Sequence, residues 1–344
     1  MTSNKIASNK QSQRVHPLLS PLTIGNLQVE NRLMVAPMAG VTDNPFRRLC
    51  KSFGAGHAVS EMMTADKALF ARKKTMFRAN FDGEIAPISA QIAGSDPEKI
   101  AEAAKYQIDN GAQIIDINMG CPAKKVLKTL AGSALLKDED LVARLLDATV
   151  NAVDAPVTLK TRLGYSNDNE NILRIAKMAE QAGIQALAIH GRTREDRYGG
   201  EARYELIREV KESVNIPIIA NGDIDSAKKA VQVYEQTGCD AIMIGRAAQG
   251  KPWIFRDISH YLQTGELLPP PTIEELKKIV LSHLEEFYQF YGEYSGCRIA
   301  RKHIAWYTSG IKNSNAFRQA MYAEETTAGQ YKVVEQFLSS CEEG

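Results

Sequence analysis

Short apolar runs rich in β-branched residues recur along the chain as far as residue 246, and each stops at a glycine, a proline or a polar cluster. Runs of this length are typical of buried strands and are too short for helices. Their spacing of roughly 30 residues is that of one strand–helix–strand unit. The predicted strands are 32–38, 57–62, 87–92, 114–119, 156–162, 186–192, 217–223 and 241–246.

Helical patterns separate these runs. The clearest predict helices at 97–110, 139–150, 170–182 and 227–237, and Gly111 and Gly183 follow two of them as stop residues. Eight strand–helix units predict an α/β fold, a (β/α)8 TIM barrel of about 250 residues. A doubly wound sheet is the alternative, but it usually has fewer strands and carries a Gly-x-Gly-x-x-Gly turn, which the sequence lacks.

The end of the chain has a different pattern. Pro269, Pro270 and Pro271 cannot lie inside a helix and predict a stiff linker. From Thr272 onward, apolar residues recur at helical spacing, which predicts a small helical bundle packed beside the barrel. We therefore expect a disordered extension over residues 1–20, a barrel over 21–265 and a C-terminal helical domain over 272–344.

Composition narrows the class of protein. The chain is 44% hydrophobic and 24% charged, with a formal net charge of +1, as in an ordinary globular protein. It has no run of about 18 apolar residues, which a membrane span needs. The first 20 residues are polar and lack the apolar stretch of a secretory signal. We expect a cytoplasmic protein that makes no membrane contact, and we take it to be a monomer.

The cysteines and histidines give no sign of a metal site. Five cysteines are widely spaced and never form a Cys-x-x-Cys pair, so neither a disulfide framework nor a zinc site is predicted. The six histidines lack the spacing of metal ligands as well. We expect no metal.

Candidate chemistry gathers where the strand that begins at Ile114 ends. Cys121 is the first reactive side chain beyond that strand, and Asn118, Lys124 and Lys125 lie in or next to the same turn. A thiol, an amide and two ammonium groups together suit a reaction on a polyanionic substrate. On residue type alone, Cys121 can equally be a small buried hydrophobic residue.

The other strands also end in polar residues, and in a TIM barrel the carboxyl ends of the strands form the active site. Singly, each residue has a structural explanation, such as a solvated strand end. Together they predict one site. Gly222 and Gly245 lie where barrels commonly bind phosphate, and Arg246 adds a fork-shaped donor, so we expect a phosphorylated cofactor or substrate. The residues at the ends are 37–40, Glu61, Gln91, Lys160, Arg162, His190, Arg192, 221–223, Gly245 and Arg246.

Several motifs follow one another along the chain: Ala-Pro-Met-Ala-Gly-Val-Thr-Asp, Gln-Ile-Ala-Gly, Asp-Ile-Asn-Met-Gly-Cys-Pro-Ala-Lys-Lys-Val, Leu-Lys-Thr-Arg-Leu-Gly, Ile-His-Gly-Arg-Thr-Arg, Asn-Gly-Asp-Ile and Ile-Gly-Arg-Ala. In this order they resemble the tRNA-dihydrouridine synthase family, most closely its bacterial B-type branch. The resemblance extends from Leu22 to the end of the chain.

This resemblance implies an FMN-dependent oxidoreductase that uses NADPH to saturate the C5–C6 bond of uridine in tRNA. Hydride would pass from reduced FMN to C6, and Cys121 would give a proton to C5. The residues implied to contact FMN are Pro37, Met38, Ala39, Gln91, Lys160, His190, Asn221, Gly222, Asp223, Gly245 and Arg246. Substrate contacts are expected from Asn118, Arg162 and Arg192 by resemblance, and from Lys124, Lys125, Arg298, Arg301 and Lys302 by charge.

The chemistry of these residue types agrees with that reaction. Hydride addition at C6 leaves an enolate that needs a proton, and a thiol with a pKa near 8.5 is protonated at neutral pH. If Lys124 and Lys125 lie close to Cys121, they favour the thiolate instead. The ammonium group of Lys160 is suited to stabilising an anionic reduced flavin.

Two segments are strongly basic despite the even charge balance. Residues 117–137 contain four lysines and residues 294–323 contain five lysines and arginines, and neither segment has an acidic residue. A polyanion responds to the local field, so these segments are the predicted tRNA-binding surfaces. Trp306 and Tyr307 either present aromatic faces to RNA or belong to the core. The glutamates of the helical tail, Glu274, Glu275, Glu285 and Glu286, are expected on the opposite face.

Three alternatives stay open from the sequence. The first is a flavin-dependent barrel oxidoreductase that acts on a free pyrimidine. The second is an aldolase that forms a Schiff base on Lys160, which lies on a predicted barrel strand. The third is a non-catalytic RNA-binding protein, which leaves the polar strand ends unexplained.

Overall fold

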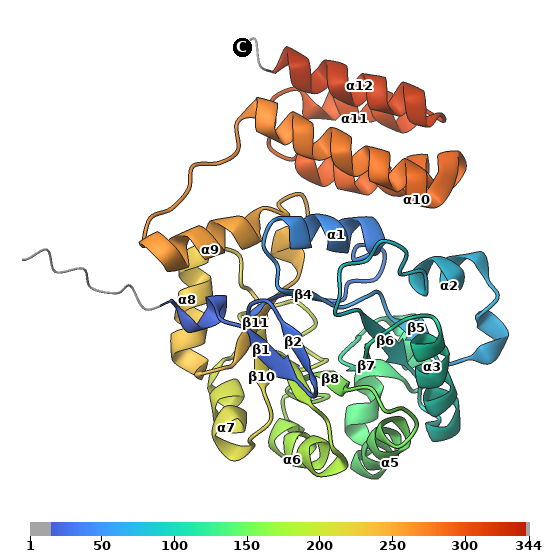
Figure 1. Cartoon of the computed structure of the whole chain (residues 1–344), viewed down its shortest axis with the longest axis vertical. Helices are drawn as coiled ribbons and strands as arrows, with labels where there is room; N and C mark the ends of the chain where they lie inside the picture. The colour runs from blue at the N-terminus through green and yellow to red at the C-terminus, as the bar shows by residue number, and fades with distance from the viewer. Residues whose placement is uncertain (1–14, 342–344) are drawn as a thin grey trace, which may run out of the picture.

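The computed structural model describes residues 15–341, except for the side chain of Lys74. A ring of strands and helices forms the larger part of the molecule, and three helices at the end of the chain form a separate layer against one side of it (Figure 1). Within the described residues, no helix is long and apolar enough to cross a membrane.

The larger part confirms the predicted TIM barrel. Its parallel strands form one curled sheet in the order β4–β3–β11–β10–β9–β8–β7–β6–β5. The strands are β3 (Leu33–Val35), β4 (His57–Ala58), β5 (Met63–Thr64), β6 (Ser89–Ala93), β7 (Ile114–Met119), β8 (Val157–Arg162), β9 (Ala186–His190), β10 (Ile218–Asn221) and β11 (Ala241–Ile244). The helices around them are α1 (Asn44–Ser52), α2 (Lys73–Arg78), α3 (Pro97–Asp109), α4 (Lys124–Leu127), α5 (Glu139–Val150), α6 (Ile172–Ala182), α7 (Glu205–Ser213), α8 (Ala227–Thr237) and α9 (Ile254–Thr264).

One predicted strand is interrupted. The run that begins at His57 forms two short strands, β4 and β5, which pair with different neighbours, β3 and β6. Between them, Val59 forms a parallel bridge with Ser89, and the N–H of Ser60 donates to the carbonyl of Ser89 at 2.9 Å. This bridge joins β4 to β6, so the two short strands together occupy one position in the barrel.

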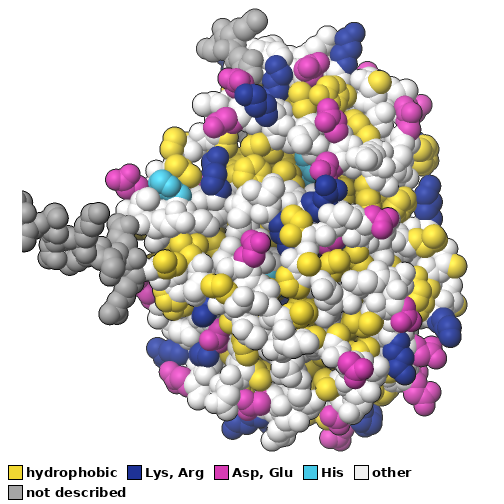
Figure 2. Space-filling view, viewed as in Figure 1, with side chains coloured by type: hydrophobic (Ala, Val, Ile, Leu, Met, Phe, Trp, Pro, Cys, Tyr) yellow, Lys and Arg dark blue, Asp and Glu magenta, His cyan; other side chains and the backbone are white. Residues whose placement is uncertain are grey.

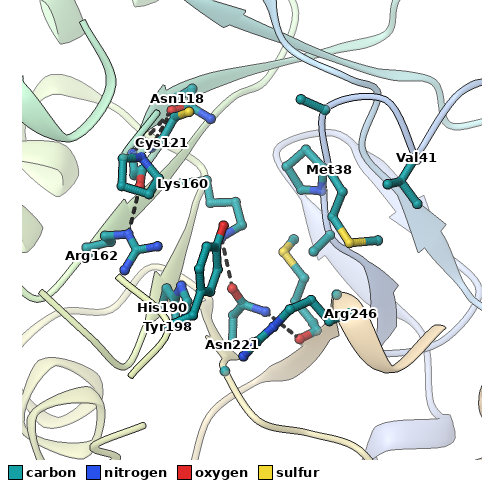
Figure 3. A pocket seen from close by; sticks show the side chains of 18 of the residues that line it. Met38, Val41, Asn118, Cys121, Lys160, Arg162, His190, Tyr198, Asn221 and Arg246 are labelled. Carbon is teal, nitrogen blue, oxygen red and sulfur yellow. Dashed lines mark hydrogen bonds between the residues drawn. The ribbon is translucent and has the colours of Figure 1, made fainter. Parts of the chain in front are cut away.

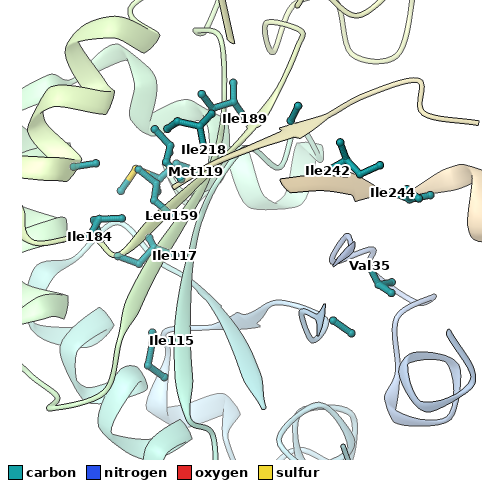
Figure 4. Close-up of a cluster of buried hydrophobic side chains, with 14 of the residues drawn as sticks. Val35, Ile115, Ile117, Met119, Leu159, Ile184, Ile189, Ile218, Ile242 and Ile244 are labelled. Atoms are coloured by element: carbon teal, nitrogen blue, oxygen red, sulfur yellow. The ribbon is translucent and has the colours of Figure 1, made fainter. Parts of the chain in front are cut away.

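The barrel core explains why the strands read as continuous apolar runs. Side chains such as Ile115, Ile117, Leu159 and Ile189 are fully buried (Figure 4). Strands of a parallel sheet that is covered by helices are buried on both faces, which removes the alternation of polar and apolar residues. A hairpin of β1 (Leu22–Ile24) and β2 (Leu27–Val29), not predicted from the sequence, packs on the starting ends of the strands.

Local signals set several helix boundaries. The carboxylate of Asp138 accepts the N–H of Leu141 at 2.9 Å, so α5 begins at Glu139 as predicted. Gly183 ends α6 in the left-handed conformation, with φ of 92°, which a glycine adopts without a Cβ penalty.

Some expectations were wrong in detail. Residues 1–14 of the predicted disordered extension lie outside the described residues, but Pro17–Leu19 form a short 3-10 helix, η1, because Leu18 is fully buried in the barrel core. Lys124 and Lys125, expected in or next to the turn that carries Cys121, lie in the short helix α4 that follows it.

The predicted helical bundle consists of α10 (Ile273–Tyr307), α11 (Ser314–Ala323) and α12 (Thr327–Ser340), and α11 was not predicted. Thr272 starts α10 with a capping box in which its side chain and that of Glu275 each accept a backbone N–H of the other residue. Gly292 has non-helical angles, φ 72° and ψ 175°, so α10 is two helices joined at a kink. The bundle has its own apolar core.

A buried hydrogen bond links the bundle to the barrel. The hydroxyl of Tyr291 donates to Asp43 Oδ2 at 3.0 Å, while Asp43 Oδ1 accepts the N–H of Phe46 at the start of α1. Burial and the nearby charge of Glu61 raise the pKa of Asp43 to about 7. In the folded protein Asp43 therefore gains and loses its proton near neutral pH, far above the range of an exposed carboxyl.

An Asp43→Asn variant should isolate the contribution of Asp43 ionisation to the free energy of unfolding. Asparagine is an equally good helix N-cap and carries no charge. The pKa of Asp43 is higher in the folded than in the unfolded protein, so its protonation stabilises the fold at low pH and that contribution is lost as pH rises from about 4 to about 7. The wild-type protein should lose on the order of 3 kcal/mol relative to the variant over this range. Urea denaturation at several pH values measures the difference in unfolding free energy between the two proteins. A difference that does not change with pH contradicts this prediction.

Candidate active site

A cavity of about 990 Å³ opens at the carboxyl ends of the barrel strands, where the sequence placed the site (Figure 3). Most of the predicted site residues line it together. They are Pro37, Met38, Ala39, Gln91, Asn118, Cys121, Lys124, Lys160, Arg162, His190, Asn221, Gly222, Asp223, Gly245 and Arg246. Lys125, Arg192, Arg298, Arg301 and Lys302 are not part of the lining.

Asn118 holds the backbone at Cys121. Its Oδ1 accepts the N–H groups of Gly120 and Cys121, at 3.2 and 3.0 Å, so the turn after β7 is fixed by the last part of the strand itself. Close packing adds to this, because a Cβ on Gly132 would lie 2.7 Å from the carbonyl oxygen of Cys121. The position of Cys121 therefore depends on a defined turn rather than on a free loop.

Asp116, which the sequence reasoning missed, orients Asn118 through a buried relay. The Oδ2 atom of Asp116 accepts from Gln91 Nε2 at 2.7 Å, and Gln91 Oε1 accepts from Asn118 Nδ2 at 2.8 Å. Thr158 donates to the other carboxylate oxygen at 2.7 Å. Because the NH2 group of Gln91 donates to the carboxylate of Asp116, the side-chain carbonyl oxygen of Gln91 faces Asn118. The sequence does contain a signal that could have identified Asp116, because it is an acidic residue inside an otherwise apolar predicted strand.

The thiol of Cys121 is held in its protonated form. Burial raises the pKa of the thiol, and this effect outweighs the opposing N–H of Ala123 and the positive charges of Arg162 and Lys160. We considered that Lys124 and Lys125 would favour the thiolate if they lay close. The main effect on the pKa of Cys121 is instead burial, which favours the thiol. A protonated thiol at neutral pH is the form that a general acid needs.

Lys160 on β8 and Asn221 on β10 form a pair that spans the intervening strand β9. Lys160 Nζ donates to Asn221 Oδ1 at 2.9 Å, and Asn221 Nδ2 donates to the carbonyl of Met243 at 2.8 Å. Burial, together with the charge of Arg162, lowers the pKa of Lys160 to about 8. Its charge is thus poorly solvated and available to stabilise an anion in the cavity.

Arg162 and Tyr198 form the wall beside Cys121. Arg162 donates through Nε to the carbonyl of Gly120 at 2.7 Å and through one terminal nitrogen to the carbonyl of Thr193 at 2.9 Å. The Tyr198 ring lies between two guanidinium groups, 5.6 Å from that of Arg162 and 4.7 Å from that of Arg246. Tyr198 lines the cavity and is 54% exposed, but it follows no strand end and was not predicted.

His190 is neutral. Burial lowers the pKa of its imidazole, and the charges of Arg162 and Lys160 lower it further. A neutral ring can donate one hydrogen bond and accept another without adding charge to the cavity. The predicted position of His190 in the site is therefore compatible with a contact to a polar ring edge.

Arg192 lies outside the cavity lining. Its guanidinium is 98% buried beneath the rim and donates to both carboxylate oxygens of Asp223, at 2.9 and 2.7 Å. It also donates to the carbonyl of Gly199 at 2.9 Å and to that of Gly200. All five of its N–H groups have partners within the chain, and Arg192 holds Asp223 and the turn that carries Tyr198. Its contact with substrate stays a prediction.

The predicted basic residues of the bundle do not line the cavity, but Lys302 lies close to it, because a Cβ on Gly40, between the lining residues Ala39 and Val41, would be 3.4 Å from Lys302 Nζ. Arg298 is exposed beside the Tyr294 ring, whereas Arg301 donates to the carbonyl of Glu324 at 2.8 Å. Tyr307 is buried in the core of the bundle and presents no face to RNA, whereas Trp306 is half-buried and packs against the barrel core. Glu286 pairs with Arg48 of the barrel at 3.2 Å, so it lies at the junction and not on a remote face.

Comparison with known proteins gives a consistent result. The family model described as "Dihydrouridine synthase (Dus)" matches residues 34–342. A protein from Pseudomonas aeruginosa named tRNA-dihydrouridine synthase B is 57% identical over 321 residues, covering 93% of this chain and 97% of that protein. A Vibrio cholerae protein of the same name is 56% identical over 93% of this chain and 99% of its own length. A solved structure described as a variant of NCR from Zymomonas mobilis has a TM-score of 0.52 at 17% identity, covers 75% of this chain and 94% of that chain, and shares the fold.

Proposed function

Because this chain belongs to the dihydrouridine synthase family, we propose that it reduces specific uridines of tRNA to 5,6-dihydrouridine. The observation that carries the proposal is the position of a protonated thiol, Cys121, in one cavity with the buried ammonium group of Lys160. The proposed substrate is consistent with the cytoplasmic location expected from the sequence.

FMN fits the other side of this cavity. Lys160 and Asn221 offer an ammonium and an amide for a flavin ring, and the short helix η4 (Arg246–Ala248) begins without a side-chain cap, which leaves its first N–H groups for a phosphate. Gly222 has a φ of 125°, and a Cβ there would lie 2.8 Å from Ala202, so only glycine permits this backbone. When bound, FMN supplies hydride chemistry, and NADPH is the proposed reductant.

The chain's own residues supply the proton and the orientation. Cys121 Sγ holds a proton at the edge of the cavity, and hydride addition at C6 of uracil makes C5 basic, so this proton passes to C5. Asn118 and the Asp116 relay fix the backbone that carries the thiol. Arg162 lies beside the same turn and is placed to balance negative charge that develops on the uracil carbonyl oxygen.

The lowered pKa of Lys160 also suits a lysine that forms a Schiff base, the aldolase alternative. Flavin content separates the two. The purified protein should be yellow and release about one FMN per chain on denaturation. Lys160→Met should lower the FMN content, whereas Lys105→Met, at an exposed position on α3, should retain it. A colourless protein that cannot be reconstituted with FMN contradicts the proposal.

A further inference from the structure

A third basic stretch lies between β5 and β6 and plays no part in the site described above. Residues 67–81, here called the α2 segment, contain five lysines and arginines and no acidic residue. Lys67, Arg72 and Lys73 have exposed side chains. Their positive charge therefore faces solvent.

Two of the acidic groups around the α2 segment are paired with arginines, and the five cations of the segment outnumber the flanking carboxylates of Asp66 and Asp82. Glu61 pairs with Arg78 at 3.4 Å, and Glu84 with Arg47. Asp66 Oδ1 accepts the N–H of Ala68 at 3.1 Å. Among the described residues, Lys67, Arg72 and Lys73 form no ion pair, so the field in front of them is positive.

The α2 segment is also fixed in place. Arg78 donates to the carbonyl of Met62, a residue of the cavity lining, at 3.1 Å. The Phe77 ring packs against the rings of Phe290 and Tyr291 in α10, with centroids 5.6 and 4.8 Å apart. The segment is thus attached both to the mouth of the cavity and to the bundle, as the position of α2 beneath α10 shows (Figure 1).

On its other side, the α2 segment approaches the lysine-bearing turn after β7. A Cβ on Gly94 would lie 2.8 Å from the Cβ of Ala65, which lies two residues before the start of the segment. The next residue, Ser95, donates through Oγ to the carbonyl of Thr129 at 2.7 Å. Only the short turn after β6 therefore separates the α2 segment from α4 and its two lysines.

We propose that the α2 segment binds the phosphate backbone of tRNA and joins the basic turn after β7 to the helical bundle in one continuous surface. This inference rests on the proposed function. Regularly spaced phosphates match cations that are exposed, unpaired and held on a rigid support. Most of the face seen in Figure 2 instead has lysines and arginines interspersed with acidic side chains.

The decisive variant is Lys67→Ala/Arg72→Ala/Lys73→Ala in the full-length protein, with tRNA affinity measured over a range of salt concentrations. Loss of three phosphate contacts should flatten the slope of log affinity against log salt by about 2, and weaken binding on the order of tenfold or more at 0.15 M salt. FMN content and NADPH oxidation should not change. The control is Lys105→Ala/Lys177→Ala/Lys228→Ala, three exposed positions on α3, α6 and α8, which should keep wild-type affinity and slope.

Met76→Glu provides an independent variant, because Met76 is 57% exposed on α2 and a carboxylate there opposes the same phosphates. It should also weaken tRNA binding. Wild-type affinity and slope in the triple variant overturn the proposed surface while leaving the proposed function intact. Equal losses in the control variant overturn the surface as well. A wild-type protein that neither binds tRNA nor forms dihydrouridine overturns both.

Discussion

Replacing Cys121 with alanine is expected to slow uridine reduction by a factor of about 10² to 10⁴, the usual effect of removing one general acid. The reason is that Cys121 holds the proton that C5 needs, in a turn fixed by Asn118. Oxidation of NADPH by the bound flavin requires no such proton and should stay nearly intact. Stopped-flow measurement of the two half-reactions separates these effects.

Cys341→Ala is the matched control, because Cys341 lies at the end of α12 in the helical bundle. It should leave both half-reactions unchanged. An equal loss of both half-reactions in Cys121→Ala means that Cys121 supports the flavin or the fold instead of the proton transfer. Unchanged uridine reduction means that another group is the acid.

Replacing Arg192 with methionine is expected to destabilise the protein by about 3 kcal/mol or more, because a buried charged partner is removed. The carboxylate of Asp223 loses two hydrogen bonds, and the carbonyls of Gly199 and Gly200 lose their donor. Although burial opposes it, the hydrogen bonds from Arg192 and from the N–H of Ala202 lower the pKa of Asp223, so this carboxylate is charged and needs its partners. Chemical denaturation measures the loss.

Arg208→Met, at an exposed position on α7, should change stability by less than about 0.5 kcal/mol. The Arg192 variant should also bind uridine-containing substrate less well, because the turn that carries Tyr198 is no longer held. If Arg192→Met is as stable as the control and loses only tRNA affinity, Arg192 contacts substrate as first expected from the sequence.

The elements that matched prediction carry strong local signals. Helices α5 and α8 begin and end where predicted, because a capping Asp138 or Ser226 precedes an amphipathic run. The interrupted strand at β4 and β5 was not predicted, since its break at residues 59–62 depends on pairing with two different neighbours. Pairing partners that lie far apart in sequence are absent from any local pattern.

The site residues likewise divide into those that a local sequence signal identifies and those that depend on contacts distant in sequence. Asn118, Cys121 and Lys160 were predicted because each lies at or just beyond the end of an apolar strand, and such ends converge in a barrel. Asp116 and Tyr198 were missed, since one is a buried residue of a strand and the other lies in a long turn. Arg192 follows the same strand-end pattern as Arg162, but its partner Asp223 is 31 residues away in the sequence, and only the fold shows that it is already paired.

Mapping dihydrouridine in tRNA from cells that lack this chain examines the proposed reaction directly. One or more uridine positions should lose the modification, regain it when the wild-type chain is restored, and stay unmodified when Cys121→Ala is supplied instead. Retention of every dihydrouridine in the cells that lack the chain contradicts the proposed function, and full restoration by Cys121→Ala contradicts the role of its thiol.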